Sequence, residues 1–229
     1  MLLNAACERD PYRDWLREGV KRYGVPVYGY CITRNHVHVI AHAVNRESIS
    51  RMMQLAAGST AKAFNLRKNR SDAMWEHPYH CTIIQDGQHL LNCLCYVDLN
   101  MVRAGVVSHP SEWKWSGFQE LVGERARYRI LDVNGLLERL DFSSPDNFGA
   151  YYNERIAERI DSDSLQREAH WTEALAVGSE QFVDTVRKEY RSRYVFSAEQ
   201  LPNGAWHVRE EPAAYSVKKA QIFDSKPPK

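Results

Sequence analysis

The sequence lacks long hydrophobic runs and a strong excess of charge of one sign. No apolar stretch approaches the ~20 residues that a membrane-spanning helix needs, so we expect no membrane partner. The 30 Lys and Arg residues almost balance the 29 Asp and Glu residues, and the net charge of +1 gives no indication of a nucleic-acid partner. With 44% hydrophobic and 26% charged residues, the composition excludes a disordered or fibrous chain.

Cysteine is also scarce, with five residues among 229. An odd number of cysteines, with no leader that resembles a signal peptide, predicts free thiols and a cytoplasmic protein. Cys93 and Cys95 have no second pair at metal-ligand spacing, so we do not expect a zinc site.

The charge balance differs between the two parts of the chain. Residues 1–130 carry 17 Lys and Arg against 12 Asp and Glu, a net charge of +5. Residues 131–229 carry 13 against 17, a net charge of −4. The two parts could face different partners or each other, and chance fluctuation explains the split equally well.

Local patterns predict both helices and strands. In the first part they indicate a helix from Asp10-Pro11 to Gly24, a β-hairpin over 27–33 and 36–43, a helix over 48–65, a strand over 79–84 and a helix over 88–102. After about residue 123, helices are indicated near 132–140, 146–160 and 179–190. We predict an α+β fold, with one domain over 1–122 and a helical C-terminal extension over 123–229 that ends in a loose tail.

Two histidines lie at strand spacing in the predicted hairpin. Side chains alternate between the faces of a strand, so His36 and His38 point the same way while Val37 and Val39 point to the other face. Two imidazoles in this arrangement can hold one divalent metal ion. On this pattern alone, two histidines on a solvated sheet face are the commoner explanation.

A tyrosine and an amide lie at helical spacing further along the chain. Tyr96 and Asn100 are four residues apart, which places them on one helix face, and Arg103 continues that face. The apolar residues lie on the other side of the helix and would pack against a sheet. A surface tyrosine with a polar neighbour is the plainer alternative.

Together these two signals resemble the single-tyrosine HUH transposases, and more closely the transposases associated with repetitive extragenic palindromes (REP-associated tyrosine transposases). The resemblance runs from about Tyr12 to Phe118, and Glu180–Val183 is similar to the C-terminal helix of that family. It rests on Tyr-Cys-Ile-Thr-Arg-Asn-His-Val-His over 30–38, Phe64-Asn65, Trp75, Tyr-Val-Asp-Leu-Asn-Met-Val-Arg-Ala-Gly over 96–105, and Trp-Lys-Trp-Ser-Gly-Phe over 113–118.

The resemblance implies a fold, a cofactor and a chemistry. The fold would be a ferredoxin-like antiparallel sheet with helices on one face. His36, His38 and Asn100 would bind Mg²⁺ or Mn²⁺, and Tyr96 would attack DNA to give a 5′-phosphotyrosine. The partner would be single-stranded DNA that carries a hairpin, and a homodimer is a further expectation.

Candidate DNA contacts follow from charge and from the resemblance. Cations suit the DNA backbone, and aromatic rings can stack on unpaired bases. Trp113, Trp115 or Tyr79 could stack on bases, although core packing is the preferred explanation for Trp75 and Trp115. The predicted DNA-binding residues are Arg34, Arg51, Lys62, Arg67, Lys68, Arg70, Arg103 and Trp113.

The sequence departs from the family pattern at its start, because residues 1–9 do not match the first strand that usually precedes the first helix. Met101 replaces the usual proline, and His77-Pro78 replaces a Gly-Arg pair. These differences leave a catalytically impaired DNA-hairpin-binding relic as the alternative. A metallohydrolase that uses His36 and His38 with water is a third possibility.

Overall fold

The computed structural model describes residue 3 and residues 5–45, 47–76, 78–162, 165–190 and 196–210. Contacts divide the chain into two compact units, which we treat separately. The first unit comprises Met1–Tyr79 and Leu90–Arg167, and the second comprises His80–His89 and Glu168–Lys229. The predicted tail lies outside the described residues.

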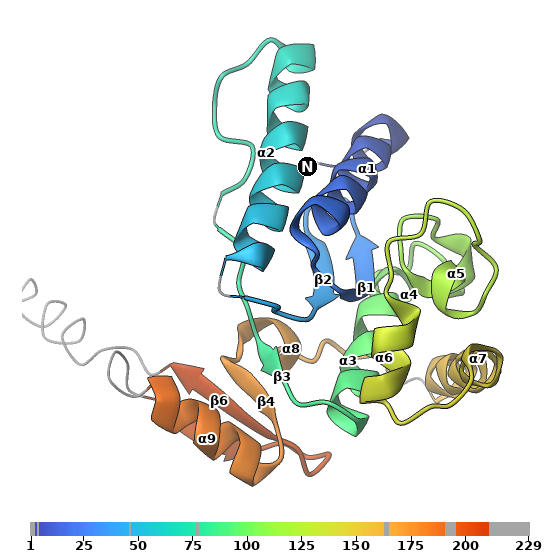
Figure 1. The fold of residues 1–229 in the computed structure, drawn as a ribbon, viewed down its shortest axis with the longest axis vertical. Coiled ribbons are helices and arrows are strands. Elements are labelled where there is room, and N and C mark those ends of the chain that lie inside the picture. The colour runs from blue at the N-terminus through green and yellow to red at the C-terminus, as the bar shows by residue number, and fades with distance from the viewer. Residues whose placement is uncertain are drawn as a thin grey trace, which may run out of the picture. The chain divides into compact units, whose positions relative to one another are not determined.

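In the first unit, the first two helices of the chain pack against each other (Figure 1). Helix α1 (Ala6–Tyr23) begins before the predicted start at Asp10-Pro11 and includes Pro11, because the Glu8 carboxylate accepts a hydrogen bond from the amide of Ala5 at its first turn. It ends at Gly24, whose φ of 61° suits glycine. Helix α2 (Ser48–Lys68) approaches α1 closely, since a Cβ on Gly19 would lie 3.0 Å from the Met52 side chain.

The predicted β-hairpin is confirmed. Strands β1 (Val27–Ile32) and β2 (Val37–Ala41) pair in antiparallel fashion, and Cys31 lies opposite His38. The amide of Thr33 donates to the carbonyl of His36 and closes the turn. On the other edge of β1, Ile32 N donates to Trp115 O and Gly117 N donates to Tyr30 O, so a loop covers that edge.

The first unit therefore holds two strands of the expected ferredoxin-like sheet among its described residues. The predicted strand over 79–84 is reduced to β3 (Ile83–Ile84), and it belongs to the other sheet. Ile83 N and Gln85 N donate to Leu175 O and Val177 O, and these bonds hold the strand in that sheet. The α+β class itself is confirmed.

The remaining elements of the first unit are helical. Helix α3 (Gln88–Asp98) packs on β1, where the lack of a side chain at Gly29 makes room for Leu94. The predicted helix over 88–102 is interrupted at Leu99, after which α4 begins. The elements that follow are α4 (Asn100–Arg103), the 3-10 helix η1 (Pro110–Glu112), α5 (Phe118–Leu121), α6 (Val133–Arg139) and α7 (Pro145–Asp161).

A buried polar network fixes the chain that connects α5 to α6. The carboxylate of Glu120 accepts hydrogen bonds from the hydroxyl of Tyr30 (2.9 Å) and from the amides of Ile130 and Leu131. Arg125 adds an ion pair with Glu120 at 3.5 Å. The buried charge is thus paired and hydrogen-bonded, as burial requires.

The second unit is a small sheet with a helix packed on it. Its strands run in the order β3-β4-β6-β5, and α9 (Glu180–Tyr190) covers one face through Val183 and Val186. The other elements are α8 (His170–Glu173), β4 (Ala176–Gly178), β5 (Phe196–Gln200) and β6 (Trp206–Glu210).

The predicted C-terminal helices are present as α6, α7 and α9, but the extension is not only helical. Strands β4, β5 and β6 were missed because they are only three to five residues long, so any alternation of apolar and polar residues covers few positions. The borders of the compact units differ from the predicted border at residue 122, and the division into domains stays a prediction. Within the described part of the chain, no helix has the length and hydropathy needed to span a membrane.

Candidate active site

The histidine pair is oriented by the turn of the hairpin. The Thr33 hydroxyl donates to the carbonyl of His36 at 2.8 Å, and Nδ1 of His36 lies 2.9 Å from Oδ1 of Asn35. The contact with Asn35 engages Nδ1, so Nε2 is the nitrogen that His36 would offer to a metal. The rings of His36 and His38 meet edge to face with their centroids 4.7 Å apart.

The surroundings of both imidazoles favour the neutral form, although His36 is exposed and His38 is half-buried. Desolvation lowers the pKa of His36, and the nearby Arg103 charge adds to the effect. Desolvation likewise lowers the pKa of His38 to about 3, helped by the charges of His36 and Arg103. A neutral imidazole keeps the lone pair that a metal ion needs.

Helices α3 and α4 bring Tyr96 and Asn100 to the same place. Nδ2 of Asn100 lies 3.0 Å from Nε2 of His38, and the ring centroids of His38 and Tyr96 are 6.3 Å apart. The side chain of Tyr96 is buried, with 4% of its surface exposed. The structure thus gathers the predicted metal ligands and the predicted nucleophile from one chain.

The donor set fits a divalent ion that accepts nitrogen and oxygen. A half-turn of the Asn100 amide exchanges its NH₂ for its oxygen, and the two are commonly indistinguishable in structures. His36 and His38 would then supply two nitrogens beside one oxygen, a mixed set compatible with Mn²⁺ or Mg²⁺. Among the described residues, no cluster of three or more His, Cys, Asp or Glu offers another metal site.

Arg103 lies on Tyr96 itself. Its guanidinium carbon is 4.0 Å from the centroid of the tyrosine ring, and its Nη2 donates to the Tyr96 carbonyl at 3.1 Å. The sequence predicted Arg103 as a DNA contact. The structure places it against the predicted nucleophile instead.

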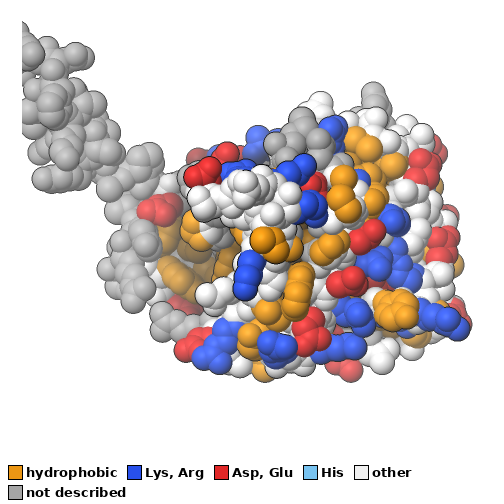
Figure 2. Space-filling view, turned by 90° about the horizontal axis from the view of Figure 1, so that it is seen from above, with side chains coloured by type: hydrophobic (Ala, Val, Ile, Leu, Met, Phe, Trp, Pro, Cys, Tyr) orange, Lys and Arg blue, Asp and Glu red, His pale blue; other side chains and the backbone are white. Residues whose placement is uncertain are grey.

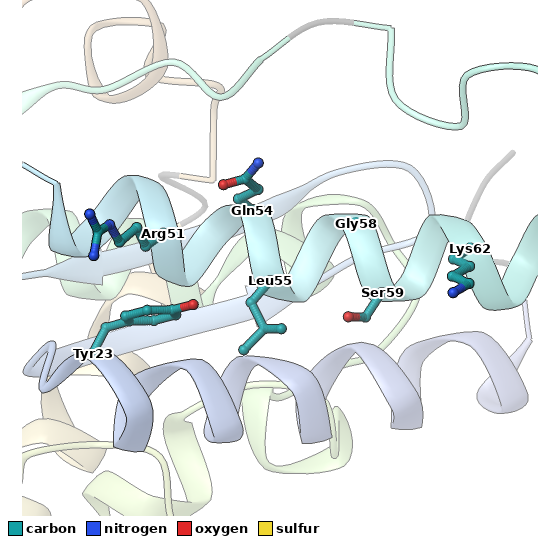
Figure 3. A pocket seen from close by; sticks show the side chains of 7 residues that line it. All are labelled: Tyr23, Arg51, Gln54, Leu55, Gly58, Ser59 and Lys62. Atoms are coloured by element: carbon teal, nitrogen blue, oxygen red, sulfur yellow. The ribbon is translucent and has the colours of Figure 1, made fainter.

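The other predicted cations are dispersed over the first unit. Arg51 and Lys62 line a groove of about 340 Å³ along α1 and α2, with Tyr23 at one end and Ser59 between them (Figure 3). In the face shown in Figure 2, Lys and Arg side chains lie among Asp and Glu side chains, so that face has no broad basic surface.

Several of these cations already have acidic partners. Arg51 pairs with Glu47, Arg67 pairs with Glu8 at 2.9 Å, and Arg70 lies 3.8 Å from Asp72. Lys68 and Arg34 are exposed. None of the contacts given above joins these cations to His38, Tyr96, Asn100 or Arg103.

The predicted aromatic contacts are mostly in the core. Trp113 is 7% exposed, and its indole N–H donates to the carbonyl of Ile32 at 3.0 Å. Trp115 is 9% exposed and lies under the guanidinium of Arg9 at 3.9 Å. This burial favours core packing over base stacking for both rings. Tyr79 is exposed, and its hydroxyl lies 2.7 Å from that of Ser50.

The sequence did not predict a buried hydrogen-bonded pair formed by Asp98, two residues after Tyr96, and Tyr152. Asp98 is 2% exposed and accepts a hydrogen bond of 2.7 Å from the hydroxyl of Tyr152 on α7. Desolvation raises the pKa of Asp98 to about 7, and the bond from Tyr152 opposes that rise. The signal in the sequence was a single acid, Asp98, among the apolar residues at the end of α3. Its partner Tyr152 lies 54 residues further along the chain, so local pattern does not indicate the pair.

Comparison with known proteins bears on the same region. Residues 2–100 match the family model described as "Transposase IS200 like", a stretch that includes both histidines, Tyr96 and Asn100. This part of the chain is similar to IS200-like transposases. The match supports the transposase assignment and a DNA-processing enzyme in general. Neither the curated proteins nor the solved structures include a match to this chain.

Proposed function

We propose that this protein nicks and rejoins single-stranded DNA at hairpin sites through a covalent bond to Tyr96. The observation that carries the proposal is the convergence of His38, Tyr96 and Asn100, with His36 beside them, within one chain. The likeness of residues 2–100 to IS200-like transposases supports DNA as the substrate. The REP-associated subtype, from the motifs over 30–38 and 96–105, is part of the proposal.

In the proposed reaction the phenol oxygen of Tyr96 attacks the scissile phosphorus. The new O–P bond forms as the bond from phosphorus to the 3′ oxygen breaks. The phenol loses its proton and the departing 3′ oxygen gains one, so DNA is left with a free 3′-hydroxyl and a 5′-phosphotyrosine. Attack by a 3′-hydroxyl reverses these steps, so rejoining needs no ATP.

The residues around Tyr96 would supply the activation that a phenol needs in order to attack phosphorus near neutral pH. A phenol has a reference pKa of ~10, so it is a poor nucleophile near neutral pH without help. A divalent ion bound by His36, His38 and Asn100 would polarise the phosphoryl oxygens and stabilise the charge that develops on them. The neutral imidazoles and the amide are the groups that would hold this ion.

The first prediction concerns the nucleophile. Incubation with Mn²⁺ and a pool of hairpin-forming oligonucleotides with randomised single-stranded flanks should give a covalent protein–DNA adduct on a denaturing gel. Tyr96→Phe removes the attacking oxygen and should abolish the adduct. Tyr128→Phe, at an exposed tyrosine, is the control and should retain it. An adduct of equal yield in Tyr96→Phe would show that Tyr96 is not the nucleophile.

The alternative is a hairpin-binding relic without catalysis. It is favoured by the sheet of the first unit, in which the described residues form two paired strands where the resemblance implies more. This alternative predicts hairpin binding that survives EDTA and gives no adduct with the unmodified chain. DNA cleavage that persists in Tyr96→Phe would instead support a metallohydrolase.

A further inference from the structure

We propose that Arg103 is a positioning residue that holds Tyr96 in its attacking orientation. This inference rests on the proposed function, because it assigns a role toward the nucleophile of that reaction. It differs from the sequence-based prediction, in which Arg103 contacts the DNA backbone. Two independent contacts to Tyr96 carry it.

The first contact is to the main chain. The last four carbonyls of a helix have no partner within that helix, and Tyr96 is among the last four residues of α3. Nη2 of Arg103 donates to the Tyr96 carbonyl at 3.1 Å, across the interruption of the helix at Leu99. The Arg103 side chain, which extends from α4, thereby fixes the end of α3 at Tyr96.

The second contact is to the ring. The guanidinium carbon of Arg103 lies 4.0 Å from the ring centroid of Tyr96, a distance at which a cation is attracted to the face of an aromatic ring. One arginine therefore holds both the backbone and the side chain of Tyr96. With both ends held, the rotation that would move the phenol away from His38 is restricted.

The planar guanidinium suits this double contact. It can stack on a ring with its flat face while an N–H at its edge donates a hydrogen bond. The ammonium of lysine is a point charge that can keep the cation near the ring but cannot match both contacts. A substitution by lysine should therefore restore only part of the effect, whereas methionine removes both the charge and the donor.

The experiment compares the parent chain with R103K and R103M. The rate of adduct formation is measured at saturating concentrations of the oligonucleotide pool with Mn²⁺, and pool affinity is measured by fluorescence anisotropy in EDTA. In a DNA-free arm, 3-fluorotyrosine is placed at position 96 and its ¹⁹F NMR signal is recorded. Arg22→Met, at an exposed cation on α1 that pairs with Glu18, is the matched control.

We expect R103M to lower the saturating rate by on the order of 10²-fold, since a small misplacement of a reacting group can cost that much. Affinity should change far less, R103K should fall between R103M and the parent, and R22M should match the parent. The ¹⁹F signal of R103M should shift or broaden relative to the parent. R103K keeps the test valid if R103M does not fold.

Two results would overturn the role of Arg103 alone. In the first, the parent forms the adduct, and R103K and R103M both match the parent in saturating rate and in ¹⁹F signal. The other is a loss of affinity with an unchanged saturating rate, which would make Arg103 a DNA contact. Failure of the parent itself to form an adduct would overturn the proposed function, and the inference with it.

Discussion

At the scale of single residues, burial sets the protonation of the groups around Tyr96. Asp98 and His38 are both pushed toward their neutral forms, the first by a raised and the second by a lowered pKa. The consequences for stability have opposite signs. His38 costs stability as the pH falls below about 6.5, because the unfolded chain gains a proton that the folded chain resists. Asp98 costs stability as the pH rises.

A prediction for Asp98 follows from its pKa of about 7 in the folded chain, against an ordinary value of 3.8. Between these values the unfolded chain releases a proton that the folded chain keeps, so stability is lost as the pH rises. D98N removes this loss. The stability of D98N minus that of the parent should grow between pH 4 and 7, by at most about 1.4 kcal/mol per pH unit.

Urea denaturation of both proteins across this pH range measures the difference. The comparison uses the difference because His38 titrates in both proteins and its contribution cancels. Parallel stability curves for D98N and the parent would contradict the assignment of a largely protonated Asp98.

At the scale of elements, α7 is tied to α3 below the tyrosine. The hydroxyl of Tyr152 donates to Asp98, and Nη2 of Arg155 and of Arg159 each donate to Oδ1 of Asn92 at 2.9 Å. A helix that the sequence assigned to the C-terminal extension therefore supports the helix that carries Tyr96. The predicted domain over 1–122 would lack this support.

Removal of the Tyr152 hydroxyl tests the tie between the two helices. Tyr152→Phe should lower the free energy of unfolding by about 1–3 kcal/mol, because the buried Asp98 loses a hydrogen-bond donor. Chemical denaturation near pH 6 measures it. The control is Tyr151→Phe, at the preceding residue of α7, which is half-buried. An equal effect of both substitutions would mean that the bond to Asp98 contributes no stability.

At the scale of the whole molecule, charge is divided between the two parts of the sequence. The net +5 of residues 1–130 includes cations that already pair with acids, such as Arg51 with Glu47 and Arg67 with Glu8. One hypothesis for the split is that the acidic part competes with DNA, so that deletion of residues 131–229 tightens binding. That deletion also removes Tyr152, so single substitutions are the cleaner test.

Salt dependence tests whether the groove along α1 and α2 contacts DNA. Each phosphate contact to single-stranded DNA contributes ~0.7 to the slope of log K against log salt concentration. Lys62→Met should reduce that slope by about this amount. Lys188→Met, at an exposed lysine of α9, should leave the slope unchanged. Anisotropy titrations of a hairpin oligonucleotide at several salt concentrations measure this slope, and an unchanged slope for Lys62→Met would exclude Lys62 as a phosphate contact.

The features that the sequence determined by itself are those that depend on local composition and short-range periodicity. The hairpin follows from runs rich in aromatic and β-branched residues on either side of a short turn. The shared face of His36 and His38 follows from the two-residue repeat of a strand, and that of Tyr96 and Asn100 from the 3.6-residue repeat of a helix. Only the tertiary structure decided the partner of β3, the burial of Trp113 and the bond from Tyr152 to Asp98. These depend on which distant segments satisfy a buried donor or acceptor, and local periodicity carries no information about that choice.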